Sequence, residues 1–391
     1  MRKNNDSKIL QEIISIEQNI NRNLSLELFN DFHLTNMNNK LLENSISFQK
    51  VRNPDITVVM LVYNQARFLH KCLRSIQNQS IKTIEIIIVD DCSLDNSTEI
   101  IKEYRKDDPR IIIIEHDANE GRIKSRSDGI RKAKGKYITV IDGDDSFIHK
   151  DILKNSFYIA QKANLDVTEF QGFTYRFGKL ERIIKNYPYL NLQRILYQPE
   201  LKTKFIFMNN NYPSDFVNRA IWGKLIKKKL FKQILEYIGY EYTNDFINVA
   251  EDTIMVISLF HLAKSYYLMK EVGYLYTFEQ KEKKIYKLEN KVCRTINNKI
   301  KGFDFVKFLK FLVWKTGNDE KEQNMAYTEI LSVNYDYLLN KISLHKKIYQ
   351  IIINILNTAL QFQFLNVSKK ENLIKLKQKV IQKSVQDNIF L

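Results

Sequence analysis

The sequence predicts an α/β fold with a mostly parallel sheet flanked by helices, and three observations support this prediction. Strand-like and helix-like segments alternate from residue 56 to residue 142. The links between them are short, which is typical of parallel strands with helices on both faces of the sheet. Each strand-like segment is followed by polar side chains, and ligands bind beyond the carboxyl ends of the strands in such sheets.

The individual elements follow from the residue patterns. ITVVMLV at 56–62 is a continuous apolar run of strand length, as expected of a strand that is buried on both faces. Three later runs repeat this pattern, and the segments between them have apolar residues at helical spacing. The expected strands are 56–62, 83–89, 110–116 and 137–142, and the expected helices between them are 66–79, 97–106 and 121–134.

The regular alternation ends after Ser146. A mixed region with strands and helices is expected there, and from about residue 281 the chain is rich in lysine and mostly helical in pattern. Residues 1–52 have one mostly apolar helical face. The expected helices are 149–163, 224–237 and 251–264, and a strand or strand pair is expected at 266–278. We expect three regions: a helical N-terminal extension at 1–52, a main domain at 53–280, and a basic helical region at 281–391. The main domain has two expected halves, 53–147 and 148–280.

Composition narrows the class of protein. The 391 residues are 44% hydrophobic and 27% charged, which is typical of a globular chain. The formal net charge of +16 suits a polyanionic partner, although biased composition would also explain it. The three cysteines have no CxxC spacing, so neither a zinc site nor a disulfide framework is expected. The N-terminus lacks an apolar leader, and residues 348–365 are too polar to span a bilayer, so we expect a cytoplasmic protein, with peripheral membrane contact left open.

An acidic cluster follows the fourth expected strand. Asp142, Asp144 and Asp145 surround Gly143, and hard carboxylate oxygens in this arrangement suit Mg²⁺ or Mn²⁺ with substrate phosphates completing the shell. An acidic turn that caps a helix needs only one aspartate. A calcium loop of the EF-hand type needs a glycine at its sixth position and a glutamate at its twelfth, and both are missing. The cluster therefore predicts a metal–diphosphate site.

Six segments in order resemble family 2 glycosyltransferases of the GT-A fold. The resemblance covers roughly residues 55–280, and it says nothing of the two ends of the chain. Each motif alone is weakly specific, but their order and spacing are specific together. The segments are VVMLVYNQARFLHKCLRSIQNQS, EIIIVDDCSLDNS, NEGRIKSRSDG, GKYITVIDGDD, WGKLIKKKLF and AEDTIMV.

The resemblance implies a nucleotide-sugar donor bound with a divalent metal. By this resemblance Asp144 is the direct metal ligand, Asp142 lies near the ribose and the metal, and Asp145 is in a supporting position. Asp91 would accept the imide hydrogen of uracil, although turn capping would also explain this residue. The residues implied on the donor side are Val62, Tyr63, Asn64, Asp91, Asn119, Arg126, Asp142 and Gly143.

On the acceptor side, the resemblance implies that Asp252 is a general base, with Glu251 beside it and Trp222 as a wall of the acceptor pocket. One base opposite the leaving group implies direct displacement with inversion. The open alternatives are a helix-start acid for Asp252, a core position for Trp222 and a surface-helix arginine for Arg126. The acceptor would be a glycan, a lipid-linked molecule or a protein, and no nucleic acid is expected.

Some residues depart from the family pattern. Leu61 stands where the family usually has proline, Cys92 and Leu94 replace glycine and threonine, and Ser127-Asp128 replaces an asparagine. UDP is therefore only the favoured nucleotide.

A nucleotidyltransferase is an alternative function, but it needs a glycine-rich basic loop after the first strand, and VYNQARF has no glycine. A non-catalytic scaffold that uses its basic surface is the other alternative.

Overall fold

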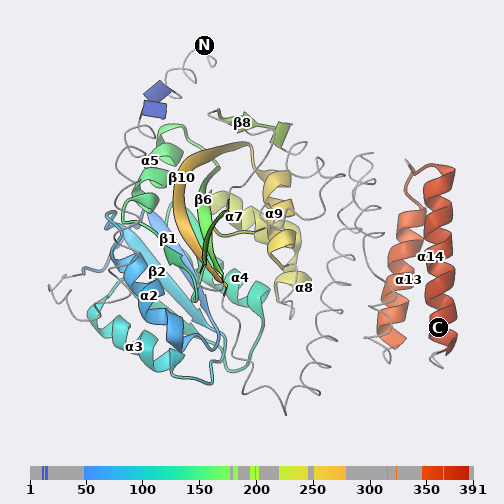
Figure 1. Cartoon of the computed structure of the whole chain (residues 1–391), viewed down its shortest axis with the longest axis horizontal. Helices are drawn as coiled ribbons and strands as arrows, with labels where there is room; N and C mark the ends of the chain where they lie inside the picture. Colours follow the sequence, from blue (N-terminus) through green and yellow to red (C-terminus); the bar gives the residue numbers. More distant parts are fainter. Residues whose placement is uncertain are drawn as a thin grey trace.

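The computed structural model describes a central sheet between helices (Figure 1). The described residues are 48–176, 179–183, 194–198, 200–201, 220–244, 251–278, 346–363 and 365–386, with single positions 11, 12, 14, 15, 315 and 323. Most of the predicted N-terminal extension and the first part of the predicted basic region lie outside them. The domain boundaries given above therefore stay predictions.

The first half of the main domain has the predicted parallel strands. β1 (Ile56–Val62) lies between β2 (Ile84–Asp90) and β4 (Tyr137–Asp142), and β3 (Ile111–Glu115) pairs with the outer side of β2, all in parallel. All four agree with the apolar runs to within one residue at each end. The α/β fold with a helix-flanked sheet is confirmed, and the carboxyl ends of these strands share one edge of the sheet.

The apolar side chains of the strands alternate between two cores. Val59 and Leu61 face one core, whereas Val58, Met60 and Val62 face the other. Burial on both faces explains why each strand is a continuous apolar run. One core contains residues of α4 (Arg122–Lys132), α7 (Lys228–Ile238) and α9 (Glu251–Leu262), and the other contains residues of α2 (Ala66–Gln77), α3 (Ser97–Asp107) and α5 (Ile152–Lys162).

The second half extends the same sheet with mixed pairing. The strand order is β3-β2-β1-β4-β9-β6-β10-β5. β6 and β10 run parallel to each other, and β9 pairs antiparallel with both β4 and β6. The added elements are β5 (Ser146–Phe147), β6 (Val167–Arg176), β7 (Lys179–Ile183), β8 (Leu196–Tyr197), β9 (Lys224–Lys227), α8 (Tyr240–Thr243) and β10 (Ser265–Phe278).

One predicted element is wrong at its start. Residues 224–227 were expected as the first turn of a helix, but they form β9, and the helix begins at Lys228. The strand exists because it fills the space between β4 and β6, which local helical spacing does not reveal. Lys224 is fully buried there, and its Nζ lies 3.0 Å from the Glu169 carboxylate. The helix expected at 149–163 is shorter, at Ile152–Lys162.

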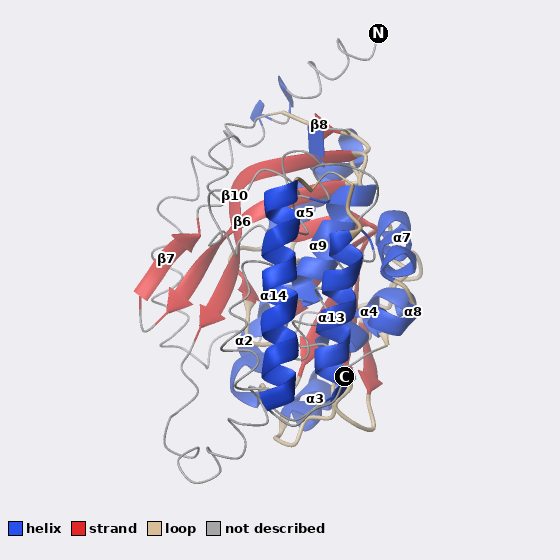
Figure 2. Ribbon diagram, turned by 90° about the vertical axis from the view of Figure 1, so that its right-hand side faces the viewer, coloured by secondary structure: helices blue, strands red, loops and turns tan. Residues whose placement is uncertain are grey.

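Two further features concern the N-terminal segment and the C-terminal helices. Glu12 forms a 2.7 Å ion pair with Lys162 of α5, which brings this part of the N-terminal segment to the domain. α13 (Lys346–Leu360) and α14 (Val367–Gln386) lie side by side, as both views show (Figure 2). Within the described residues, no helix has the length and apolarity needed to cross a membrane.

Candidate active site

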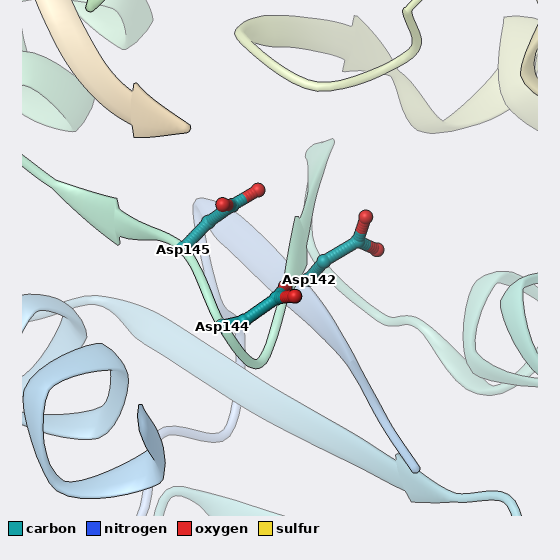
Figure 3. Close-up of side chains that lie close together, drawn as sticks. All are labelled: Asp142, Asp144 and Asp145. Atoms are coloured by element: carbon teal, nitrogen blue, oxygen red, sulfur yellow. The ribbon is translucent and has the colours of Figure 1, made fainter. Parts of the chain in front are cut away.

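The acidic cluster lies on a tight turn at the carboxyl end of β4. The Asp145 N–H donates to the Asp142 carbonyl at 3.0 Å, and the Gly143 N–H donates to the Leu61 carbonyl at 2.8 Å. A Cβ on Gly143 would lie 2.4 Å from the Gln65 side chain, so only glycine fits without a shift. The turn gathers the three carboxylates so that one oxygen from each lies within 4.8 Å of the others (Figure 3).

The three aspartates differ in their surroundings. Asp145 is buried, accepting a 2.6 Å hydrogen bond from the Tyr274 hydroxyl and a 2.8 Å bond from the Thr277 N–H. Burial, followed by the charges of Asp144 and Asp142, raises the pKa of the Asp145 carboxyl well above its usual value. Asp142 and Asp144 are only half-buried. These two carboxylates are therefore the ones accessible to a ligand, and Asp145 supports the turn from below.

The donor set fits a divalent metal. A closely spaced group of carboxylates repels itself, and hard cations such as Mg²⁺ and Mn²⁺ prefer oxygen ligands. Two half-buried carboxylates leave the remaining positions open to water or to phosphate oxygens. Asp142 and Asp144 are the residues that would hold the ion.

Arg126 connects the acidic turn to the start of α9. Its side chain is 1% exposed, and its guanidinium lies 3.5 Å from Asp142, 2.8 Å from Asp252 and 3.8 Å from Glu251. Burial disfavours its charge, but these three carboxylates outweigh burial, and the pKa of Arg126 is raised. The structure therefore brings together Arg126, Asp142, Glu251 and Asp252. Its contacts also exclude the alternative of a surface-helix arginine.

A second arginine of α4, Arg122, lies at this cluster and is not among the predicted site residues. Its guanidinium lies 3.5 Å from Glu251, and its side chain is 59% exposed. The charges of Asp142, Glu251, Asp252 and Asp144 raise its pKa against the effect of partial burial. Arg122 is four residues before Arg126, so both lie on one face of α4. This four-residue spacing from Arg126 is the sequence feature that could have identified Arg122.

Several buried polar atoms of the predicted site residues have no hydrogen-bond partner among the described residues. They are Arg126 Nε and Nη1, Asp252 Oδ1 and Asn119 Oδ1. The 2.8 Å contact between Arg126 and Asp252 is thus an ion pair by distance, without hydrogen-bond geometry. Buried polar atoms are usually satisfied, and exceptions are common where a ligand completes the set. The Asp252 side chain, 28% exposed, offers its carboxylate to such a ligand.

The loop after β1 is tied to the loop after β2. Val62 ends β1, and Tyr63 beyond it is exposed. Asn64 adopts a left-handed φ of 53°; its side-chain oxygen accepts from the Leu94 N–H at 2.7 Å, and its own N–H donates to Ser93 Oγ at 3.0 Å. These bonds fix the two loops beside each other at the edge of the sheet that carries the acidic turn.

Asp91 organises the loop before α4. One carboxylate oxygen accepts from the Glu120 N–H and contacts His116 Nδ1, both at 2.8 Å, and the other accepts from the Gly121 N–H at 2.9 Å. Gly121, at φ 88°, then leads into the helix of Arg126. This is a loop-capping role of the kind left open above.

Trp222 is a core residue by its contacts. It is 7% exposed and stacks on Tyr274 with ring centroids 4.6 Å apart, while Gly172 lies close against its edge. Because Tyr274 donates to Asp145, the indole supports the acidic turn through β10. Little of its surface remains for an acceptor, so a role as an acceptor wall stays a prediction.

Comparison with known protein families covers part of this arrangement. The family model described as Glycosyl transferase family 2 matches residues 57–235. Residues 57–235 are a family 2 glycosyltransferase domain. The matched region contains the acidic turn, Asp91, Arg126 and Trp222, and it ends before Asp252.

Two relatives of known sequence are similar to about half of this chain. The chain is 32% identical over 197 residues to "Glycosyltransferase GlyA" of Streptococcus pneumoniae serotype 4, covering 49% of this chain and 27% of that protein. It is 30% identical over 223 residues to "Uncharacterized glycosyltransferase EpsJ" of Bacillus subtilis, covering 57% of this chain and 61% of that protein. The matches thus span about a quarter and about three-fifths of these relatives.

The fold of the glycosyltransferase domain also has solved counterparts. The chain matches the crystal structure of S. aureus TarS residues 1–349 in complex with UDP-GlcNAc, with a TM-score of 0.57 and 15% sequence identity. The match covers 86% of this chain and 93% of that one. At this identity the likeness concerns the fold, and it agrees with the GT-A architecture that the sequence motifs implied.

The paired acids at the start of α9 predict a pH-dependent stability of the glycosyltransferase domain. Burial, and then the charge of Asp252, raises the pKa of Glu251 to about 7, while Arg126 acts in the lowering direction. Because the pKa of Glu251 is higher in the folded protein than in the unfolded chain, protonation of Glu251 favours the folded protein. This stabilisation is complete below the unfolded value of about 4.5 and is lost as pH rises towards 7.

We therefore expect Glu251→Gln to remove this loss of stability. At pH 8, with chelator present, the variant should be more stable than the wild type by up to roughly 3 kcal/mol, and at pH 5 the two should be similar. Thermal melting at several pH values measures the difference. Equal pH profiles for the two proteins would contradict the raised pKa.

Proposed function

We propose that this chain transfers a sugar from a nucleotide-diphosphate sugar, with UDP as the favoured nucleotide, to an acceptor hydroxyl with inversion. The observation that carries the proposal is the buried Arg126, which joins the metal-type acidic turn to the base candidate Asp252. The proposed donor site and the proposed base would thus lie on either side of one arginine. The family of the domain supports the same activity.

Asp142 and Asp144 would hold the divalent ion, Mg²⁺ or Mn²⁺, beside the donor diphosphate. When bound, the ion supplies Lewis-acid stabilisation of the charge on the departing nucleotide. Asp145 keeps the turn in place through its bonds to β10, and Gly143 allows the close approach of the turn to Gln65.

Asp252 would take the proton of the acceptor. The acceptor oxygen attacks the anomeric carbon, the bond from that carbon to the diphosphate oxygen breaks, and the hydroxyl proton passes to the Asp252 carboxylate. Burial raises the pKa of Asp252, which makes it a better proton acceptor, and the positive charge of Arg126 keeps it ionised. Attack from the side opposite to the leaving group gives inversion.

The choice of UDP is supported by the fold neighbour. TarS was crystallised in complexes with UDP-GlcNAc and with UDP. In this chain the nucleobase would lie beside Val62, Tyr63 and Asn64, with Asp91 as the acceptor of the imide N–H. Asn119, whose buried Oδ1 has no hydrogen-bond partner among the described residues, is a further donor-side contact.

The test is release of nucleotide from a panel of nucleotide sugars, with and without Mn²⁺ or Mg²⁺. We expect turnover with a UDP-sugar, loss of turnover in excess chelator, and recovery when the metal is added back. Asp144→Asn should lose donor affinity and turnover together. Asp107→Asn, the same chemical change at an exposed position at the end of α3, is the matched control. Full turnover in excess chelator would contradict the metal site, and no turnover with any donor would favour the scaffold alternative.

A further inference from the structure

An apolar stripe lies exposed along α14. Val367, Ile374 and Ile381 recur every seven residues, and Val385 follows one turn later; these side chains are 74%, 44%, 39% and 59% exposed. Seven residues are close to two full turns, so all four lie on one face of the helix. These four residues are called the α14 stripe below.

The contact between α13 and α14 does not account for this stripe. A different face of α14, with Leu373, Val380 and Ser384, is buried. On α13, residues such as Ile352 and Leu356 are buried. The two helices lie side by side (Figure 2). α14 thus has one apolar face that is buried within the protein and a second apolar face, the α14 stripe, that is exposed.

Positive charge surrounds the α14 stripe. The helix contains six lysines and one glutamate within Val367–Gln386. Lys370 and Lys377 each follow a stripe residue by three positions, so they flank the stripe on one side, and Lys375 lies beyond its other side. The surface therefore combines aliphatic side chains with long cationic ones.

We propose that the α14 stripe and its lysines dock on an anionic lipid surface. An amphipathic helix with lysines beside an aliphatic face lies in the plane of the interface, with its apolar side chains inserted and its ammonium groups at the headgroups. The exposed side chains and the excess of lysine fit that chemistry. The proposal goes beyond sugar transfer and does not depend on it.

Docking of a second copy fits this surface less well. A coiled-coil seam needs apolar residues alternating three and four apart, but the positions three and four after Ile374 are Lys377 and Gln378. After Val367 they are Lys370 and Glu371. A polyanion such as nucleic acid would pair with the lysines but would leave the aliphatic stripe in water. An anionic bilayer satisfies both parts of the surface.

The test is co-sedimentation of the full chain with vesicles. We expect binding to phosphatidylcholine vesicles that contain phosphatidylglycerol, and little binding to phosphatidylcholine alone. Higher salt should weaken binding, because it screens exposed charges. Lys370→Gln/Lys377→Gln should lower the partition coefficient about tenfold. Lys229→Gln/Lys232→Gln on α7, with the same change in net charge, is the matched control and should have a much smaller effect.

A second pair of variants tests the apolar part. Ile374→Asn/Ile381→Asn should lower binding to anionic vesicles about tenfold or more, since each removes an inserted aliphatic side chain. Tyr240→Asn on α8, where the tyrosine is 79% exposed, is the control for loss of an exposed large side chain. If the isoleucine variant melts lower than the wild type, Val367→Asn/Val385→Asn gives the same test at more exposed positions.

Three outcomes would overturn the proposal. They are absence of binding to anionic vesicles, binding that none of the stripe variants weakens, and equal binding to neutral vesicles. Sedimentation velocity without lipid tests the alternative that a second copy of the chain binds the α14 stripe. A dimer that the stripe variants dissociate would assign this face to a second copy.

Discussion

Replacing Asp252 by asparagine is expected to lower sugar transfer by roughly 10²–10⁴-fold, the usual contribution of a general base, while donor binding stays near the wild-type value. Asparagine keeps the shape of the side chain and removes its ability to take a proton. Arg126 keeps its contacts with Asp142 and Glu251, so the donor side of the cluster retains its counter-charge. Binding and transfer should therefore separate in this variant.

The measurement combines a donor titration, nucleotide release with and without acceptor, and a melting curve. Glu251→Gln is the neighbouring comparison, because it changes an acid in the same turn of α9 that is 3% exposed and so has little access to an acceptor. Its loss of transfer should be the smaller of the two. If Asp252 were only a helix-start acid, its loss would change stability by about 1 kcal/mol or less and leave the rate intact. A variant that binds donor and transfers at the wild-type rate would remove Asp252 from the mechanism.

The strands of the first half could be predicted because their signal is local. A strand buried on both faces has to be mostly apolar, and the runs at 56–62 and 137–142 have that pattern, with Asp142 at the end of the second. β9 could not be found this way. Its four residues, two of them lysines, take strand form because β4 and β6 supply partners on both sides, which is a property of the assembled sheet.

The candidate site also has some features with a local sequence signal and others without one. The acidic turn could be predicted because three carboxylates within four residues after a strand are visible in the sequence. The position of Arg126 could not, since its contacts join a helix before β4 to a helix more than a hundred residues later. Resemblance assigned it to the donor, and the structure adds its contacts with both acids of α9. Likewise, only the structure distinguishes the buried Asp145 from its two half-buried neighbours.

Replacing Arg126 by methionine should have the largest effect on stability, because the change removes a buried cation that three acids share. Methionine approximates the length and volume of the arginine stem, so packing changes little. Asp142, Asp252 and the buried Glu251 lose a cation at 3.5, 2.8 and 3.8 Å, respectively. Removing one partner of a buried ion pair typically costs about 3–5 kcal/mol, so we expect a decrease of that order in the free energy of unfolding at pH 8.

The controls follow from the geometry of α4. Arg122→Met removes the same charge one turn earlier, but its side chain is 59% exposed, and a solvent-screened pair contributes about 1 kcal/mol or less. Adding Asp252→Asn to Arg126→Met should restore part of the lost stability, because it removes one uncompensated charge. Lower pH should also restore part of it, since Arg126 lowers the pKa of both Glu251 and Asp252, and without it these acids take up protons more readily. Denaturant unfolding in the presence of chelator measures the free energy of unfolding of the wild type, Arg126→Met, Arg122→Met and the double variant. An Arg126→Met variant as stable as Arg122→Met would mean that the cluster is open to solvent and that Arg126 does not hold its acids together.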